Sequence, residues 1–275
     1  MGGAFAAAGT LPWAALVKVN MEYMPWLPWA VPVTALYLWL FWRTVRRFED
    51  SRLNPVSEDV WGWAIVAGVL GLGALVSFFS VLNRLMRLPS QSTEGDFSHI
   101  PLPTLFTWVV MSAIVAGVTE ETSFRGFMQG PIERRHGPVV AIFVTGSFFG
   151  FAHFTHPEVT LQLMPFYMCV AIIYGLLAYF TNSVLPSMIL HAGGNVLGSL
   201  DLFTTGQSEW QASATPAPLV WETGPDAGFW LSCIAAVLTI AAAAWAYIML
   251  ARSRRVGLNA NSVKGISTVA ERQNR

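Results

Sequence analysis

The chain has 275 residues, of which 54% are hydrophobic and only 12% are charged, and its mean hydropathy is +0.50. Soluble domains carry about 25% charged residues, so this composition excludes an ordinary soluble protein and indicates a polytopic membrane protein. The formal net charge is zero, which argues against nucleic acid as a partner.

The apolar segments predict an all-α fold, a polytopic transmembrane helix bundle with about seven spans. Residues 1–19 are apolar but contain Pro12 and Lys18, so we expect an interfacial helix there; the number of spans becomes eight if this segment inserts. The predicted spans follow in order at about 29–42, 59–82, 103–129, 138–153, 161–180, 185–200 and 229–250.

Two boundaries follow from local sequence. The third span is expected to stop at Gly130-Pro131, because proline cannot continue a helix. The fourth is expected to begin at Pro138, a favourable first helical residue. Residues 1–257 are predicted to form a single transmembrane domain. Residues 258–275 lack apolar periodicity and are predicted to be a flexible cytoplasmic tail.

Basic residues divide the predicted loops into two sides. Alternation of the spans puts the loop 201–228 outside, and it contains four acidic residues and no Lys or Arg. The segments assigned to the cytoplasm are basic, with Arg43, Arg46, Arg47 and Arg52 after the first span and Arg252, Arg254, Arg255 and Lys264 in the tail. This is the positive-inside pattern. Arg84 and Arg87 disagree with it, because they lie on a loop assigned outside.

An acidic pair lies in the third span, within Val118-Thr119-Glu120-Glu121-Thr122-Ser123-Phe124-Arg125-Gly126. Ionised groups at membrane depth cost at least a few kcal/mol, and they indicate function by default. Glu121 and Arg125 are four residues apart and can pair on one helical face. Glu120 then needs a cation, a histidine or water elsewhere, and a poorly solvated carboxylate suits a general base. The alternative is an ion pair that only holds two helices together.

Other polar groups occur in the fourth and sixth spans: His153, and His191 with Asn195 four residues further on. Lipid would reject these side chains, so we expect them to face the acidic pair inside the bundle. Together they suit amide hydrolysis. Glu120 with His153 would deprotonate water, and His191 with Asn195 would donate hydrogen bonds to the oxyanion. Gly193 and Gly194 could admit a substrate backbone.

Two other functions use the same residues. Glu120, His153, His156 and His191 could ligate a catalytic zinc, although no His-Glu-x-x-His helix supports this. The acids and histidines could instead form a proton relay in a transporter. The cysteines, Cys169 and Cys233, lie in apolar runs, where reduced and buried thiols are expected. The preferred interpretation requires no cofactor and no metal.

The three motifs together resemble those of a known family. Glu120 to Gly126 resembles the Glu-Glu-x-x-x-Arg motif of the CAAX protease and bacteriocin-processing family, also called the abortive-infection family of intramembrane, metal-independent glutamic proteases. Phe149 to His153 is similar to its Phe-x-x-x-His motif, and His191 to Asn195 to its His-x-x-x-Asn motif. The resemblance implies a protease-like core at about 102–200. The first two spans and the last lie outside it.

For this chain the resemblance implies catalysis by Glu120, Glu121, Arg125, His153, His191 and Asn195. It implies that Glu120 and His153 activate water, that Glu121 and Arg125 support the site, and that His191 and Asn195 form the oxyanion hole. The partners would be the lipid bilayer and a membrane-associated protein or peptide substrate, with a prenylated CAAX protein as one option. Composition and the acidic outside loop predict a prokaryotic inner-membrane protein. Counting about 1.5 Å per residue puts Glu120 and His191 nearer the cytoplasm than His153.

Overall fold

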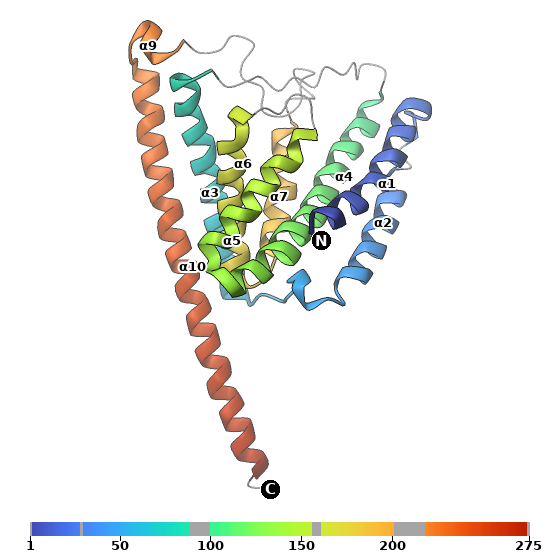
Figure 1. Cartoon of the computed structure of the whole chain (residues 1–275), viewed down its shortest axis with the longest axis vertical. Helices are drawn as coiled ribbons and strands as arrows, with labels where there is room; N and C mark the ends of the chain where they lie inside the picture. The colour runs from blue at the N-terminus through green and yellow to red at the C-terminus, as the bar shows by residue number, and fades with distance from the viewer. Residues whose placement is uncertain (1, 28–29, 88–99, 156–160, 201–217, 274–275) are drawn as a thin grey trace.

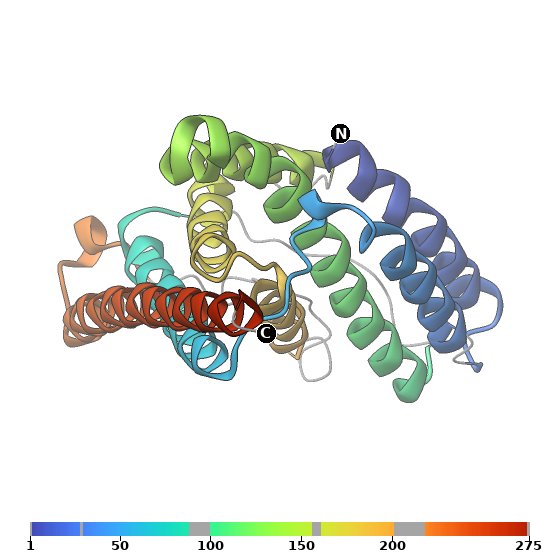
Figure 2. The ribbon, with the colours of Figure 1, turned by 90° about the horizontal axis from the view of Figure 1, so that it is seen from below.

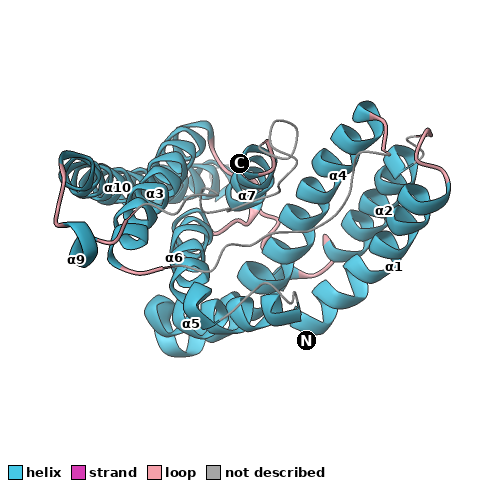
Figure 3. Ribbon diagram, turned by 90° about the horizontal axis from the view of Figure 1, so that it is seen from above, coloured by secondary structure: helices cyan, strands magenta, loops and turns pink. Residues whose placement is uncertain are grey.

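The computed structural model describes residues 2–27, 30–87, 100–155, 161–200 and 218–273, and this part of the chain is helical, without strands (Figure 3). The expected all-α fold is therefore confirmed. The α-helices are α1 (Gly2–Tyr23), α2 (Ala30–Val45), α3 (Glu58–Leu85), α4 (Leu102–Glu120), α5 (Gly130–Ala152), α6 (Met164–Thr181), α7 (Leu185–Gly198), α9 (Val220–Thr223) and α10 (Ala227–Gln273). The short helical segments are η1 (Glu49–Ser51), η2 (Glu121–Gln129), η3 (His153–Thr155) and η4 (Leu161–Leu163).

Four helical runs are long and apolar enough to cross a bilayer, and α2 supplies a shorter apolar helix at Val31–Val45. The four runs are Glu58–Leu85, Leu102–Ala152, Leu161–Thr181 and Ala227–Arg254. The second of them doubles back on itself, because α4 descends in Figure 1 and α5 returns in the opposite direction. The chain is thus an integral membrane helix bundle.

The turn between α4 and α5 differs from the expected stop at Pro131. Helical structure continues through Pro131 to His136, and the break lies at Gly137, whose φ of +81° belongs to the left-handed region that favours glycine. Pro131 is tolerated because it lies in the first turn of α5, where a missing N–H costs little. Pro138 follows the break directly.

The C-terminal segment is helical, while its predicted flexibility and cytoplasmic location stay predictions. The residues expected to form a flexible tail continue α10 as far as Gln273, and α10 extends well below the other helices in Figure 1. No proline occurs between residues 227 and 273, and the preceding membrane helix supplies the nucleus that an isolated segment would have to form for itself. The helix therefore continues through residues 258–273, although this segment lacks apolar periodicity.

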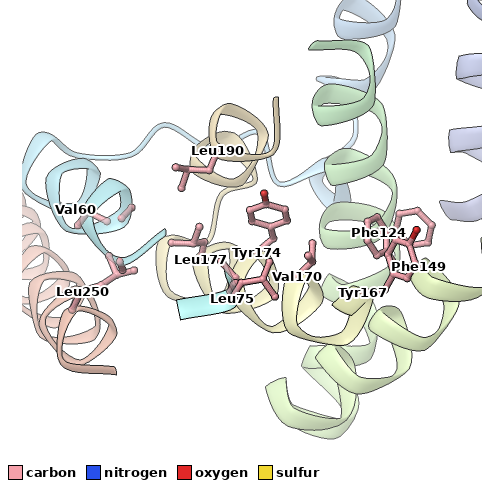
Figure 4. Packing of buried hydrophobic residues seen from close by; sticks show 14 of the residues in the cluster. Val60, Leu75, Phe124, Phe149, Tyr167, Val170, Tyr174, Leu177, Leu190 and Leu250 are labelled. Atoms are coloured by element: carbon pink, nitrogen blue, oxygen red, sulfur yellow. The ribbon is translucent and has the colours of Figure 1, made fainter. Parts of the chain in front are cut away.

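The helices are packed side by side, with α3 and α10 at one end of the bundle and α1 and α2 at the other (Figure 2). Between these ends, α5 packs against α6 and α4 packs against α7. The largest apolar cluster joins α3, α6, α7 and α10, with Leu75, Leu177, Leu190 and Leu250 among its members (Figure 4). Large apolar side chains on the outer face of α10 are exposed, as lipid contact requires.

Arg84 and Arg87, the two arginines that disagree with the charge rule, are paired with acids on the same side of the bundle. The Arg84 guanidinium donates to both carboxylate oxygens of Asp226, at 3.1 and 2.9 Å. Arg87 donates to both oxygens of Glu222, at 2.9 and 3.1 Å. Their charge is thereby neutralised by carboxylates near the start of α10, and they add no net positive charge to that side.

Candidate active site

The acidic motif lies where α4 changes into the π-helix η2, a rare form that is frequent at functional sites. Its hydroxyl groups give a local reason for this change. Thr119, Thr122 and Ser123 each donate a hydrogen bond of 2.6–2.7 Å to the carbonyl four residues earlier. Such bonds compete for the carbonyls of the preceding turn and distort an α-helix. Glu120 is therefore the last residue of α4, and Glu121 is the first residue of η2.

Glu121 and Arg125 form the pair that their spacing predicts. Arg125 Nη1 donates to Glu121 Oε1 at 2.9 Å, and the exposed fractions of the two residues are 1% and 0%. The guanidinium carbon also lies 4.5 Å from the ring centre of Phe149 and 5.6 Å from that of Tyr174. Burial makes any charge costly, so this salt bridge and the two aromatic faces are what stabilise the arginine.

His191 of α7 lies between the two carboxylates. Its Nδ1–H donates to Glu121 Oε1 at 2.8 Å, and its Nε2 is 3.9 Å from Glu120 Oε2. The ring also stacks on Tyr174, with centroids 5.2 Å apart and an interplanar angle of 18°. Sequence reasoning assigned His153 as the partner of Glu120, whereas the structure gives Glu120 an ionic contact with His191. The Glu121–His191 hydrogen bond was not predicted.

His153 is the C-cap residue of α5. Its Nδ1 lies 2.7 Å from the carbonyl oxygen of Phe149, and because a carbonyl only accepts, Nδ1 carries the proton. In the neutral ring the lone pair is therefore on Nε2, as a general base requires. The ring stacks on Tyr167 of α6 at a centroid distance of 4.3 Å. His153 is thus held by its own helix and by α6.

Four of the six predicted residues line one cavity of about 140 Å³, namely Glu120, His153, His191 and Asn195. Glu121 and Arg125 are buried behind its wall and contact it through His191. Glu120 Oε2 has no hydrogen-bond donor among the described residues. The opposite wall is apolar, with Leu72, Leu75, Phe166 and Val170. A carboxylate and two imidazoles therefore adjoin a space that can hold a small polar group beside an apolar surface.

Residue counting predicts that His153 lies at a different depth in the membrane from Glu120 and His191, yet all three line the same cavity. Counting assumes helices perpendicular to the membrane, whereas α4 and α5 are inclined in Figure 1. His153 at the end of α5 and Glu120 at the end of α4 therefore reach the same cavity. His156, which was considered as a zinc ligand, lies outside the described residues. Within the described chain, no group of three or more His, Cys, Asp or Glu side chains is arranged to hold a metal ion.

Sequence reasoning missed the aromatic residues of the site. Tyr167 and Tyr174 lie seven residues apart on α6, so both face the cavity, where they stack on His153 and His191 respectively. The available signal was two tyrosines at this spacing in an apolar span. It is a weak signal, because aromatic residues at helical spacing are usually core residues.

The fold and the cavity define a helical membrane protein with a buried cluster of acidic, arginine and histidine side chains. Comparison with protein families then gives a match: residues 102–197 match the family described as Rce1-like, type II CAAX prenyl endopeptidase Rce1-like. The match agrees with the resemblance to the CAAX protease family, and it supports a membrane endopeptidase. Searches of curated proteins and of solved structures gave no match.

Proposed function

We propose that this chain is an intramembrane endopeptidase of the glutamic type, which hydrolyses a peptide bond in a membrane-associated protein or peptide. The observation that carries the proposal is the shared cavity of Glu120, His153, His191 and Asn195. The Rce1-like match spans all three motifs that supply these residues.

Glu120 and His153 are the proposed water-activating groups. The Glu120 carboxylate lines the cavity on a side chain that is 23% exposed, so it can accept a hydrogen bond from a water molecule, and the His153 imidazole lines the same cavity. As the water oxygen attacks the scissile carbonyl carbon, its proton passes to Glu120. That proton is then delivered to the leaving amine nitrogen as the carbon–nitrogen bond breaks, and the water's hydroxyl stays on the new carboxyl group.

His191 and Asn195 are the proposed donors to the oxyanion. Because Nδ1–H of His191 is used by Glu121, the ring can donate from Nε2 only when it is doubly protonated. Glu120, Glu121, Arg125 and a protonated His191 then sum to zero charge, which suits a poorly solvated site. Glu121 and Arg125 are accordingly proposed to orient and charge His191 rather than to contact the substrate.

The charge distribution along the chain suggests how the protein is oriented in the membrane, and the lining of the cavity suggests a substrate class. From the basic residues after α2 and in the second half of α10, we propose that the C-terminus lies in the cytoplasm of a prokaryotic cell and that the bundle lies in its inner membrane. The apolar cavity wall suits a membrane-associated peptide. The family description names a CAAX prenyl endopeptidase, so a prenylated CAAX peptide is one substrate class to test.

The deciding experiment compares the wild type with Glu120→Gln in proteoliposomes. The probes are a farnesylated CAAX peptide and a library of single-span membrane peptides, with products identified by mass spectrometry. We expect the wild type to cleave and E120Q to be inactive but folded, while Glu58→Gln, at the exposed start of α3, keeps full activity. Cleavage by E120Q would refute the assignment of the base.

Two further readouts separate the other functions. Inactivation by chelators together with stoichiometric zinc in the purified protein would support a metalloprotease. Proton-coupled flux without cleavage of either probe would support a transporter. Either result would overturn the proposal.

A further inference from the structure

We propose that the hydroxyl of Tyr174 is a third donor to the oxyanion, beside His191 and Asn195. This inference rests on the proposed function and adds a catalytic residue from outside the three motifs. The same tyrosine would hold the His191 ring in place through stacking. Two roles are therefore assigned to one side chain, and they can be separated because one needs the ring and the other needs the hydroxyl.

The position of the hydroxyl carries the argument. Tyr174 is 3% exposed and lies on α6, and its ring is nearly parallel to that of His191. The hydroxyl lies 3.5 Å from the point where a Cβ on Gly194 would be. It therefore reaches the face of α7 between His191 and Asn195, the two proposed donors. Figure 4 shows this hydroxyl directed away from the apolar cluster of Val170 and Leu177.

Tyr247 is an example of a tyrosine in this bundle whose hydroxyl has a structural role. Tyr247 is partly buried nearby, and its hydroxyl donates to the carbonyl oxygen of Ile173 at 2.8 Å. Tyr174 lines the cavity instead, and within the described part of the chain its hydroxyl bonds to no protein group. A hydroxyl that lines the cavity and donates to no protein group can donate to a ligand there. The Tyr174 hydroxyl is therefore placed to donate a hydrogen bond to a substrate group in the cavity.

The chemistry of the site explains why a third donor is useful. Attack of water on a carbonyl develops negative charge on the carbonyl oxygen, while Glu120 and Glu121 lie on either side of His191. Negative charge near two carboxylates is disfavoured, and a phenolic O–H pointing at the oxygen offsets this without adding net charge. Tyr174 keeps its proton throughout, so the balance of the hydrolysis is unchanged. Gly194 leaves room for the carbonyl oxygen beside the hydroxyl.

The test replaces Tyr174 by Phe, which keeps the stacked ring and removes only the donor. Removal of one oxyanion donor lowers kcat by about 100-fold or more, and KM should change by less than about threefold. Tyr247→Phe is the matched control, since it also removes one tyrosine hydroxyl from this region and that hydroxyl has a structural hydrogen bond. It should lose thermal stability and keep kcat. The assay is cleavage of whichever probe peptide the wild type cleaves.

A second variant keeps the hydroxyl and changes its acidity. Incorporation of 3,5-difluorotyrosine at position 174 makes the phenol ionise at lower pH, and an ionised phenol cannot donate. The alkaline limit of kcat should therefore move to lower pH, a change that a purely structural hydroxyl would not produce. This measurement decides the matter if Y174F does not fold.

The outcomes separate this inference from the proposed function. If E120Q is inactive but Y174F keeps kcat within about tenfold of wild type, or loses activity only through KM, the role of Tyr174 is wrong and the proposed function stands. An unshifted alkaline limit in the fluorotyrosine protein has the same meaning. If E120Q still cleaves the probe, the proposed function itself fails.

Discussion

Gly117 controls how closely α4 approaches α7, and its replacement by Ala offers a graded test of the site. A Cβ at Gly117 would lie 2.8 Å from the carbonyl oxygen of Met188 and 3.1 Å from the backbone nitrogen of Ala192. Ordinary contact begins near 3.4 Å, so α7 would have to move away by about 0.6 Å. Backbone atoms on both sides leave no flexible side chain that could yield. Glu120 lies one turn further along α4, and His191 lies between the two contacted residues of α7.

Two free-energy terms set the size of the effect. Overpacking costs about 1–3 kcal/mol, and alanine's better helix propensity returns up to about 1 kcal/mol. We therefore expect G117A to lower the free energy of unfolding by about 1–2 kcal/mol. A misplacement of this size between catalytic groups should also lower kcat by about 10- to 100-fold.

The assay measures thermal unfolding in detergent micelles and cleavage of the probe peptide on the same preparations. Gly62→Ala on α3 is the control, because a Cβ there meets nothing within 4 Å. G62A should be at least as stable as the wild type and equally active. A G117A protein that matches G62A in both measurements would refute the close approach of α4 and α7 as the device that brings Glu120 to His191.

Two further predictions concern ion pairs outside the cavity. Arg52→Gln should destabilise the protein by about 3–5 kcal/mol, because it removes the cationic partner of Glu133, whose side chain is only 15% exposed. The double variant R52Q/E133Q should recover much of this stability in thermal unfolding. A double variant as unstable as the single one would contradict the reasoning. The Arg84 guanidinium and the Phe229 backbone N–H lower the pKa of Asp226 below its usual value of 3.8. A carboxyl group whose pKa is lowered on folding stabilises the folded state at pH values above 3.8. The wild type should therefore be more stable than Asp226→Asn near neutral pH, and this difference should shrink as the pH falls below 3.8. A difference in stability that does not change with pH would contradict this prediction.

Hydropathy and helical spacing were sufficient for the features that depend on a single helix. Apolar runs long enough to cross the bilayer predicted the helices, and four-residue spacing predicted the Glu121–Arg125 ion pair at 2.9 Å. The assignment of loops to the two sides of the membrane by the charge rule stays a prediction, and Arg84 and Arg87 are its exceptions. Those exceptions needed the structure, since their neutralising acids are more than 130 residues away in the chain.

Contacts between distant helices could not be read from spacing. His191 was assigned to the oxyanion alone, because nothing local shows that α7 packs on α4 closely enough for Nδ1 to reach Glu121. Arg52 was counted with the surface arginines that mark the cytoplasmic side. It is 5% exposed, and it donates to Glu133 and to the carbonyls of Ala178 and Arg125. Arg52, which the topology prediction counts as a cytoplasmic marker, therefore also links three helical segments, and composition does not reveal these contacts.

The junction between α4 and η2 explains how two adjacent glutamates reach one imidazole. In an uninterrupted α-helix the two side chains would point about 100° apart, and one of them would face away from α7. The wider ring of a π-helix turns the chain less for each residue, so Glu121 stays closer to the direction of Glu120. Gly117 before the junction and Gly126 after it then let α7 and the η1 loop approach the backbone, at places where a Cβ would lie 2.8 Å and 2.7 Å from a carbonyl oxygen. The motif therefore acts through its backbone as well as its side chains: the carboxylates supply the charge, and the change of helix type allows both to be used on the same histidine.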